Sequence, residues 1–342
     1  MTVKPMRQFP ATNAIGAGAA SRAAQARVLP RLERSILKTL LYFDIWNHPL
    51  SERELCQFLG VPVPTTETLQ LALGTLCASG QIHSHEGFFY LKGRSAESVT
   101  RRCRRQRHAR WMWHVARAAM HVIKRFPFVR AVLVSGELSK NATGRGSDID
   151  FFIVAEEGRL WICRSLLVLF KKVFLLNSKK FFCLNYFATP DGFPQNERNL
   201  YTATEVATLR VLYSQSHFLR FMDANRWIKA FFPNFEPRAD SEIPSNDRQS
   251  LMQRALELAL GALPLDALDT FLMRLMHRVW RERYPELDAR TREKIFLCTK
   301  SESRAYVGNF QGKILASYGE KLSAVLGAGV RGREISKNLL EA

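Results

Sequence analysis

Hydrophobic and polar positions divide the chain into an N-terminal helical part with a hairpin, a strand-rich centre and a long C-terminal part. Apolar residues recur at helical spacing over 31–46, and a capping box from Ser51 to Glu54 opens a second helix. A third helix is predicted over 65–79, and the segment QIHSHEGFFYL predicts a β-hairpin. Three helices followed by a hairpin are typical of a winged helix.

The centre of the chain alternates helices and strands. Two short apolar runs rich in β-branched and aromatic residues predict buried strands at 131–134 and 151–154, with a turn-rich segment and the short helix ELSKNA between them. A long helix over 95–125 precedes them, and a helix over 158–176 and a strand over 181–188 follow. This order is that of a small mixed α/β sheet.

Beyond Glu205 the apolar positions follow helical spacing almost throughout. The predicted helices cover 203–221, 223–231, 247–262, 265–284 and 303–326, with a linker over 233–247. Thr202 and Glu205 are interpreted as a capping box. The pattern predicts an α+β protein with four parts: a disordered basic tail (1–30), a winged helix (31–94), a mixed-sheet domain with a leading basic helix (95–200) and a C-terminal helical region (201–342).

The charge balance favours an anionic partner. The 342 residues contain 50 Lys and Arg against 31 Asp and Glu, a formal net charge of +19, which predicts attraction to nucleotides, nucleic acid or an acidic protein. The densest positive charge, RRCRRQRHAR, lies in the long central helix, and its candidate partner contacts are Arg101, Arg102, Arg104 and Arg105. A solvated basic face is the alternative interpretation.

Other partners and compartments are less favoured. The third N-terminal helix contains no Lys or Arg, so a scaffold or protein-contact role is favoured over DNA readout. The six cysteines form no CxxC pair and no regular spacing, which indicates neither a zinc site nor a disulfide framework. Charged residues interrupt the longest apolar stretch, 160–176, so no membrane partner is expected. A reducing cytoplasm is predicted; a transit peptide in the tail is the less favoured alternative.

Candidate chemistry begins with two acids at the head of the second central strand. Asp148 and Asp150 are two residues apart, so in a strand they project from one face, roughly 6–7 Å apart. At an effective dielectric constant near 20, their repulsion is about 2.5 kcal/mol. Mg²⁺ would relieve it, because this ion takes one or two carboxylates and completes its shell with water and substrate phosphate. A strand end that reaches solvent is the alternative.

A glycine turn follows the first central strand. Gly136 would let backbone N–H groups approach an anion at the start of the short helix. Lys140 and the hydroxyl groups of Ser135, Ser139 and Ser147 are candidate phosphate contacts, with exposure or ordinary turn chemistry as the alternative.

The residues SGELSKNATGRGSDIDFFIV carry a family resemblance. With the apolar strand before them, Gly136 and the Asp148-Ile149-Asp150 pattern, they resemble the signature of the DNA polymerase beta-like nucleotidyltransferase superfamily, and within it the bacterial minimal-nucleotidyltransferase-type domains. The resemblance covers 115–190. It implies a nucleoside triphosphate, with ATP favoured, bound through Mg²⁺ and transferred as a nucleotidyl group to an acceptor hydroxyl. By position it implies Asp148 and Asp150 as catalytic metal ligands and Gly136 as the phosphate-loop glycine.

Two positions depart from the family pattern. Glu137 stands where Ser or Gly usually follows the glycine, and the strand at 181–188 offers Asn185 where a third carboxylate usually lies. An amide can ligate or orient a group but cannot act as a base. Asn185 is the candidate for this third catalytic position, and a purely structural role is the favoured alternative. The alternative function is a catalytically degenerate protein of this fold that acts as a nucleic-acid or partner-binding module.

Overall fold

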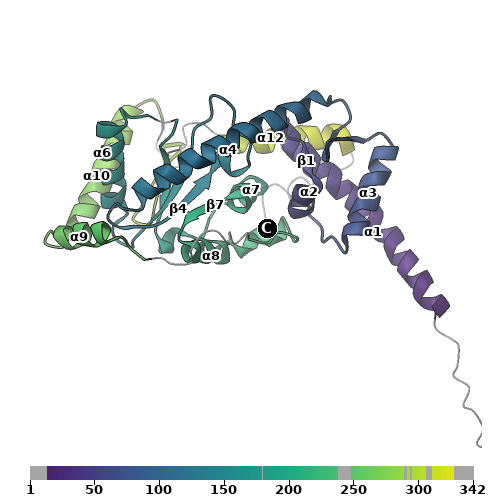
Figure 1. The fold of residues 1–342 in the computed structure, drawn as a ribbon, viewed down its shortest axis with the longest axis horizontal. Helices are drawn as coiled ribbons and strands as arrows, with labels where there is room; N and C mark the ends of the chain where they lie inside the picture. The colour runs from purple at the N-terminus through teal and green to yellow at the C-terminus, as the bar shows by residue number, and fades with distance from the viewer. Residues whose placement is uncertain are drawn as a thin grey trace, which may run out of the picture.

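The computed structural model describes residues 14–178, 180–237, 248–288, 291–292, 295–305 and 310–326. These residues form two sheets surrounded by helices (Figure 1), an α+β fold as the sequence predicts. One sheet has three strands in the order β1-β3-β2, and the other has six in the order β7-β4-β5-β6-β9-β8. Within the described ranges, every helix is too short or too polar to cross a lipid bilayer.

The N-terminal unit has the winged-helix order of helix, strand, two helices and a hairpin. Its elements are α1 (Ala14–Phe43), η1 (Asp44–Trp46), β1 (Leu50–Ser51), α2 (Glu52–Phe58), α3 (Thr66–Ala78), β2 (Ile82–His85) and β3 (Phe88–Leu91). The predicted capping box is present, because the Ser51 N–H donates to Glu54 Oε2 over 2.9 Å and the Glu54 N–H donates to Ser51 Oγ. Glu86 and Gly87 form the hairpin turn with φ of 47° and 75°.

The first helix is longer than the hydrophobic pattern predicts. It begins at Ala14 rather than at residue 31 and contains Pro30. The segment before Pro30 is rich in alanine, the residue with the highest intrinsic helix propensity, so helix forms where no amphipathic pattern marks it. The disordered tail was predicted for 1–30: its residues 14–30 are helical, and residues 1–13 lie outside the described part.

The central elements follow the predicted order. They are α4 (Glu97–Ile123), β4 (Val129–Ser135), α5 (Gly136–Ser139), β5 (Asp150–Ala155), α6 (Leu160–Phe174) and β6 (Cys183–Ala188). Strand β5 pairs antiparallel with β4 and parallel with β6, which makes the sheet mixed. This arrangement brings the start of β5 between the end of β4 and the start of β6.

The C-terminal part contributes strands as well as helices. Its elements are η2 (Pro190–Gly192), α7 (Leu200–Thr208), β7 (Arg210–Tyr213), α8 (Gln215–Ala224), η3 (Arg226–Ala230), α9 (Leu251–Leu260), α10 (Leu265–Arg283), β8 (Phe296–Cys298), β9 (Glu302–Ala305) and α12 (Phe310–Leu326). The prediction of helix was wrong for β7 and for β9, the latter at the start of the helix predicted over 303–326. Strands of three or four residues contain too little alternation to stand out beside helical periodicity. Most of the predicted linker, 238–247, lies outside the described residues.

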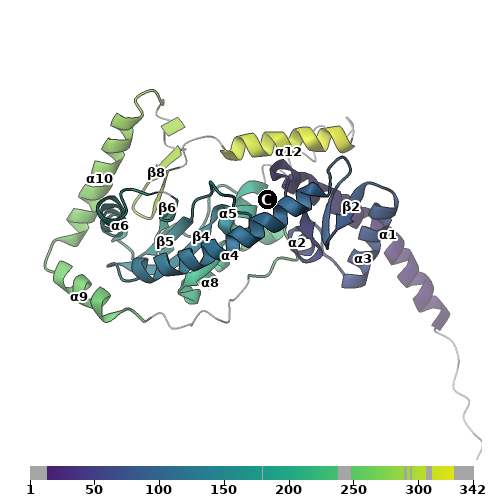
Figure 2. The same ribbon diagram turned by 45° about the horizontal axis from the view of Figure 1, so that its top comes forward.

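The two faces of the six-stranded sheet build two cores, because successive strand residues point to opposite sides. One face joins the winged helix, α8 and α12, and its residues on the central strands include Ala131, Leu133, Phe152 and Val154. The other face packs against α4, α6 and α10 through Val132, Val134, Phe151 and Ile153. Figures 1 and 2 show α4 running from the winged helix along the molecule toward α9 and α10. The winged helix is thus packed on the sheet by a shared core.

Arg102 fixes α4 to the winged helix. Its side chain is 3% exposed and donates to the Pro49 carbonyl over 2.6 Å, to Glu54 Oε1 over 2.6 Å and to His48 Nε2. The guanidinium also lies 5.0 Å from the centroid of the Phe88 ring. The prediction that Arg102 contacts an external partner was therefore wrong. A run of arginines extends around the helix, so one of them must face the core.

Candidate metal and phosphate site

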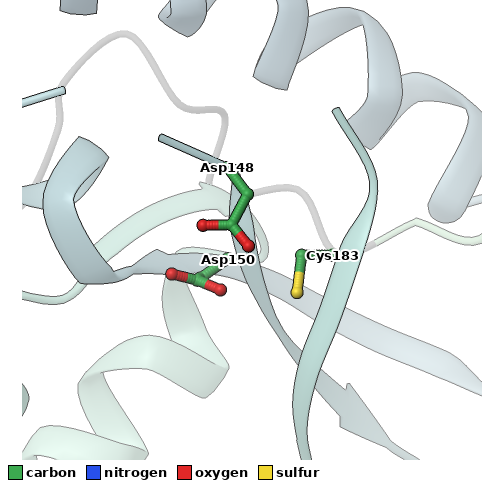
Figure 3. A group of neighbouring side chains, drawn as sticks. All are labelled: Asp148, Asp150 and Cys183. Atoms are coloured by element: carbon green, nitrogen blue, oxygen red, sulfur yellow. The ribbon is translucent and has the colours of Figure 1, made fainter. Parts of the chain in front are cut away.

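Asp148, Asp150 and Cys183 come together at the head of β5. One ligand atom from each lies within 4.8 Å of the others, and Figure 3 shows the three side chains turned toward one another from neighbouring segments. Strand β5 begins only at Asp150, but Ile149 is fully buried, so the alternation of the strand continues back to Asp148 and the two carboxylates lie together as predicted. Cys183 is the register partner of Asp150 on the parallel strand β6.

The cluster places two carboxyl groups close together in a largely buried position. Burial, the Asp148 carboxylate and the more distant Glu205 raise the pKa of Asp150 to about 6, although Cys183 and Lys140 act in the opposite direction. Burial and the two aspartates raise the pKa of Cys183 to about 12, so its sulfur stays protonated in the absence of a cation. A divalent cation would reverse both effects by favouring the deprotonated groups.

The donor set fits a metal ion. Two carboxylates are hard oxygen ligands, as Mg²⁺ prefers, while a thiolate at Cys183 would suit a softer ion such as Zn²⁺. The sequence analysis missed Cys183 because the cysteines show no ligand spacing. Only the β5–β6 register places this residue beside Asp150.

Gly136 brings the turn after β4 against the acidic cluster. Its φ is +69°, and a Cβ added there would lie 3.2 Å from Asp150 Cγ and closer still to Oδ2. Glycine alone meets both conditions without strain. The following helix, α5, is a single turn of four residues, so its dipole adds little to anion binding.

The predicted serine contacts are hydrogen-bonded within the loop itself. Each serine hydroxyl donates one hydrogen bond: Ser135 Oγ to the Asp150 carbonyl (3.4 Å), Ser139 Oγ to the Gly136 carbonyl (2.9 Å) and Ser147 Oγ to the Glu137 carboxylate. Ser147 Oγ also accepts from the Gly144 N–H over 2.7 Å. These bonds are of the kind expected from the alternative, ordinary turn chemistry, and the phosphate contacts stay a prediction.

Lys140 joins the loop to α7. Its Nζ donates to Glu205 Oε1 over 2.9 Å and to the Gly136 carbonyl over 3.2 Å. Glu205 does not form the predicted capping box, because α7 is capped by Asn199, whose side chain accepts from the Thr202 N–H over 3.0 Å. The capping box prediction was wrong because the helix starts earlier than its polar pattern indicates. Glu205 therefore lies within the helix and belongs to the surroundings of the site.

Asn185 lies two residues beyond Cys183 on β6, and its side chain is half-buried. The β5–β6 register shifts at this point: Leu184 pairs with Phe151 and Tyr186 pairs with Phe152, so Asn185 has no partner residue in the register. The position opposite Asp150 is taken by Cys183. The role assigned to Asn185 by position stays a prediction.

No family model, no curated protein and no solved structure matches this chain. The chemistry of the site is therefore inferred from its own residues. Two carboxylates beside a glycine turn and a lysine can hold a divalent cation together with a phosphorylated ligand.

Proposed function

We propose that the chain is a metal-dependent nucleotidyltransferase of the DNA polymerase beta-like type. Its substrate would be a nucleoside triphosphate, with ATP favoured, and its product an acceptor carrying the nucleotidyl group. The observation that supports this proposal is the juxtaposition of the Asp148–Asp150 pair with the Gly136 turn, across the antiparallel register in which Ser135 faces Asp150. The sequence resemblance implies the same juxtaposition.

Asp148 and Asp150 would hold Mg²⁺, which when bound supplies charge neutralisation for the phosphate groups and acts as a Lewis acid. Two features favour a cation there: the closeness of the two carboxylates and the raised pKa of Asp150. Gly136, which has no side chain, lets the turn that would receive the triphosphate pack directly against the Asp150 carboxylate. Lys140, which already donates to the Gly136 carbonyl, would contribute a positive charge at the same turn.

In the proposed reaction the acceptor oxygen forms a bond to the α-phosphorus, and the bond from that phosphorus to the pyrophosphate oxygen breaks. The acceptor proton needs a base. We assign this role to Glu205, whose carboxylate accepts from Lys140 Nζ, the same group that donates to the Gly136 carbonyl. Asn185 cannot take the role, because an amide is not a base.

Transfer of label from α-labelled ATP to protein, RNA or small-molecule acceptors tests the proposal. We expect transfer by the natural chain with Mg²⁺ and none by Asp148→Asn or Asp150→Asn. A thermal-shift screen tests the nucleotide without an acceptor: nucleoside triphosphate should raise the unfolding temperature above that of the Mg²⁺-bound chain, and it should have no such effect without Mg²⁺. Absence of any metal-dependent nucleotide effect would refute the proposal.

All six cysteines are free thiols, which favours the reducing cytoplasm as the place of action.

A further inference from the structure

One side of α4 exposes cations together with a large aromatic ring. Arg104, Arg107, Trp111 and His114 follow one another at intervals of three or four residues, so they lie on the same side of the helix. All four side chains are exposed, and 51% of Trp111 is accessible to solvent. After Glu97 the helix contains no acidic residue. We call this side the basic face of α4.

A second exposed ring meets the basic face. The Phe181 ring lies edge-on to Trp111, with 5.8 Å between their centroids, and 36% of Phe181 is exposed. Lys180 adds a cation, since its Nζ is 5.3 Å from the Phe181 centroid. Trp111 and Phe181 therefore form an exposed aromatic pair flanked by positive charge on both sides.

The segment that carries Phe181 is joined by its backbone to the acidic cluster. Ile149, the residue between Asp148 and Asp150, donates its N–H to the Lys180 carbonyl over 3.0 Å and accepts from the Cys183 N–H over 3.1 Å. The segment that carries Phe181 is thus hydrogen-bonded to the backbone between the two candidate metal ligands. A ligand that stacks on these rings would therefore lie at the end of the sheet that carries the cluster.

Such a surface has the two features that single-stranded nucleic acids require: rings on which bases stack and cations that follow the phosphates. An acidic protein would use the cations but would leave the exposed rings without a matching group. Double-stranded nucleic acid would not present its base faces to the rings. The winged helix offers no competing site on α3, which contains no Lys or Arg.

We propose that Trp111 and Phe181, with Arg104, Arg107 and Lys180, bind the end of a single-stranded nucleic acid. The strand would stack its terminal bases on the two rings and pair its phosphates with the three cations. Its terminal hydroxyl would then lie at the acidic cluster as the acceptor of the transferred nucleotide. Only this last step rests on the proposed nucleotidyl transfer; the binding itself does not.

Fluorescence anisotropy with the full chain and 12-nucleotide fluorescein-labelled oligomers, oligo-dT and oligo-rA, tests the binding. Affinity should fall as salt rises from 20 to 300 mM NaCl. Trp111→Ala with Phe181→Ala should weaken binding about tenfold or more, since each stacked base contributes strongly. Arg104→Gln with Arg107→Gln should lower the steepness of the salt dependence, because fewer counterions are released. Circular dichroism establishes that each variant folds, and Phe181→Ala alone replaces the double variant if that one does not.

Matched controls distinguish the loss of this binding surface from the loss of any exposed ring or cation elsewhere on the chain. Phe271→Ala removes an exposed ring from α10, and Arg53→Gln removes an exposed cation from α2; neither should change binding. If the natural chain binds the oligomers as expected but transfers no nucleotide to them or to any other acceptor, the nucleotidyl transfer fails and the binding surface stands. Absence of binding at 20 mM NaCl, equal binding of a duplex, preference for polyglutamate, or indifference to loss of both rings would each overturn the proposal.

Discussion

Gly136 and Asp150 are packed so closely that no side chain fits between them. A Cβ on Gly136 would lie 3.2 Å from Asp150 Cγ and closer still to Oδ2. The β4–β5 register holds them together, because Ser135, one residue before the glycine, pairs with Asp150. The turn that would receive a triphosphate and the carboxylate that would hold its metal ion therefore form one steric unit.

Gly136→Ala should disturb this unit in two ways. Alanine at φ +69° is strained, by on the order of 1–2 kcal/mol, and its Cβ displaces the Asp150 carboxylate. We expect a lower free energy of unfolding and loss of the Mg²⁺-dependent rise in unfolding temperature. Gly146→Ala is the control, since a Cβ there would meet nothing within 4 Å. If Gly136→Ala bound Mg²⁺ as tightly as the natural chain, the packing of the turn against Asp150 would not be needed for the metal site.

Asp150→Asn should stabilise the metal-free protein at neutral pH. The folded chain keeps the Asp150 proton up to about pH 6, whereas the unfolded chain releases it near 3.8, so stability falls as pH rises between these values. Above pH 6 the variant should gain on the order of 3 kcal/mol in free energy of unfolding, and below about pH 4 the gain should vanish. Urea unfolding at pH 4 and pH 7.5 measures the difference.

Asp191→Asn serves as the matched control for this measurement. Asp191 is exposed in η2, so its replacement should leave the free energy of unfolding unchanged at both pH values. If Asp150→Asn and the natural chain had equal urea midpoints at pH 7.5, the ionised Asp150 carboxylate would not destabilise the folded chain, and the prediction would be wrong. Added Mg²⁺ should reduce the difference in free energy of unfolding between Asp150→Asn and the natural chain, because it should stabilise only the natural chain.

The hydrophobic pattern predicts the long elements and misses the short ones. The bounds of helix α4 and of the inner strands β4, β5 and β6 are predicted to within a few residues. The strands stand out because burial on both faces of the sheet leaves continuous apolar runs. Strands β7 and β9 are read as helix, since a few residues cannot display alternation. The start of α1 is missed because alanine propensity, not amphipathicity, extends it.

Local spacing finds the Asp148–Asp150 pair, but partners far apart in sequence require the fold. The alternation of one strand places both acids on one face, a relationship that needs no tertiary information. Cys183 is brought to the site by the pairing of β6 with β5. Glu205 is brought there by its hydrogen bond to Lys140, which lies 65 residues away in the sequence. Helix geometry indicates that some residue of the arginine run is buried, but only the packing against Glu54 identifies Arg102.

Glu205→Gln should separate a catalytic role from a structural one. If Glu205 accepts the acceptor proton, kcat should fall by 100-fold or more with little change in KM. The loss of the half-buried Lys140 pair should lower the free energy of unfolding by no more than about 1 kcal/mol. Steady-state kinetics and urea unfolding give the two values. Glu97→Gln, at an exposed residue of α4, is the control, and unchanged turnover in Glu205→Gln would remove the assigned base.

Arg102→Met and Arg104→Met compare the same change two residues apart on α4. The first removes a buried cation and leaves Glu54 and the Pro49 carbonyl without their donor, so the free energy of unfolding should fall by about 3–5 kcal/mol. The second removes an exposed cation and should change it by less than about 0.5 kcal/mol.

Urea unfolding followed by circular dichroism measures both variants under one condition. The expected contrast follows from the side of α4 on which each guanidinium lies, since charge and size are the same in both. Oligonucleotide affinity should show the reverse order after correction for the folded fraction, because only Arg104 belongs to the basic face. Equal stability of the two variants would contradict the burial of Arg102 and, with it, the docking of the winged helix on α4 through that residue.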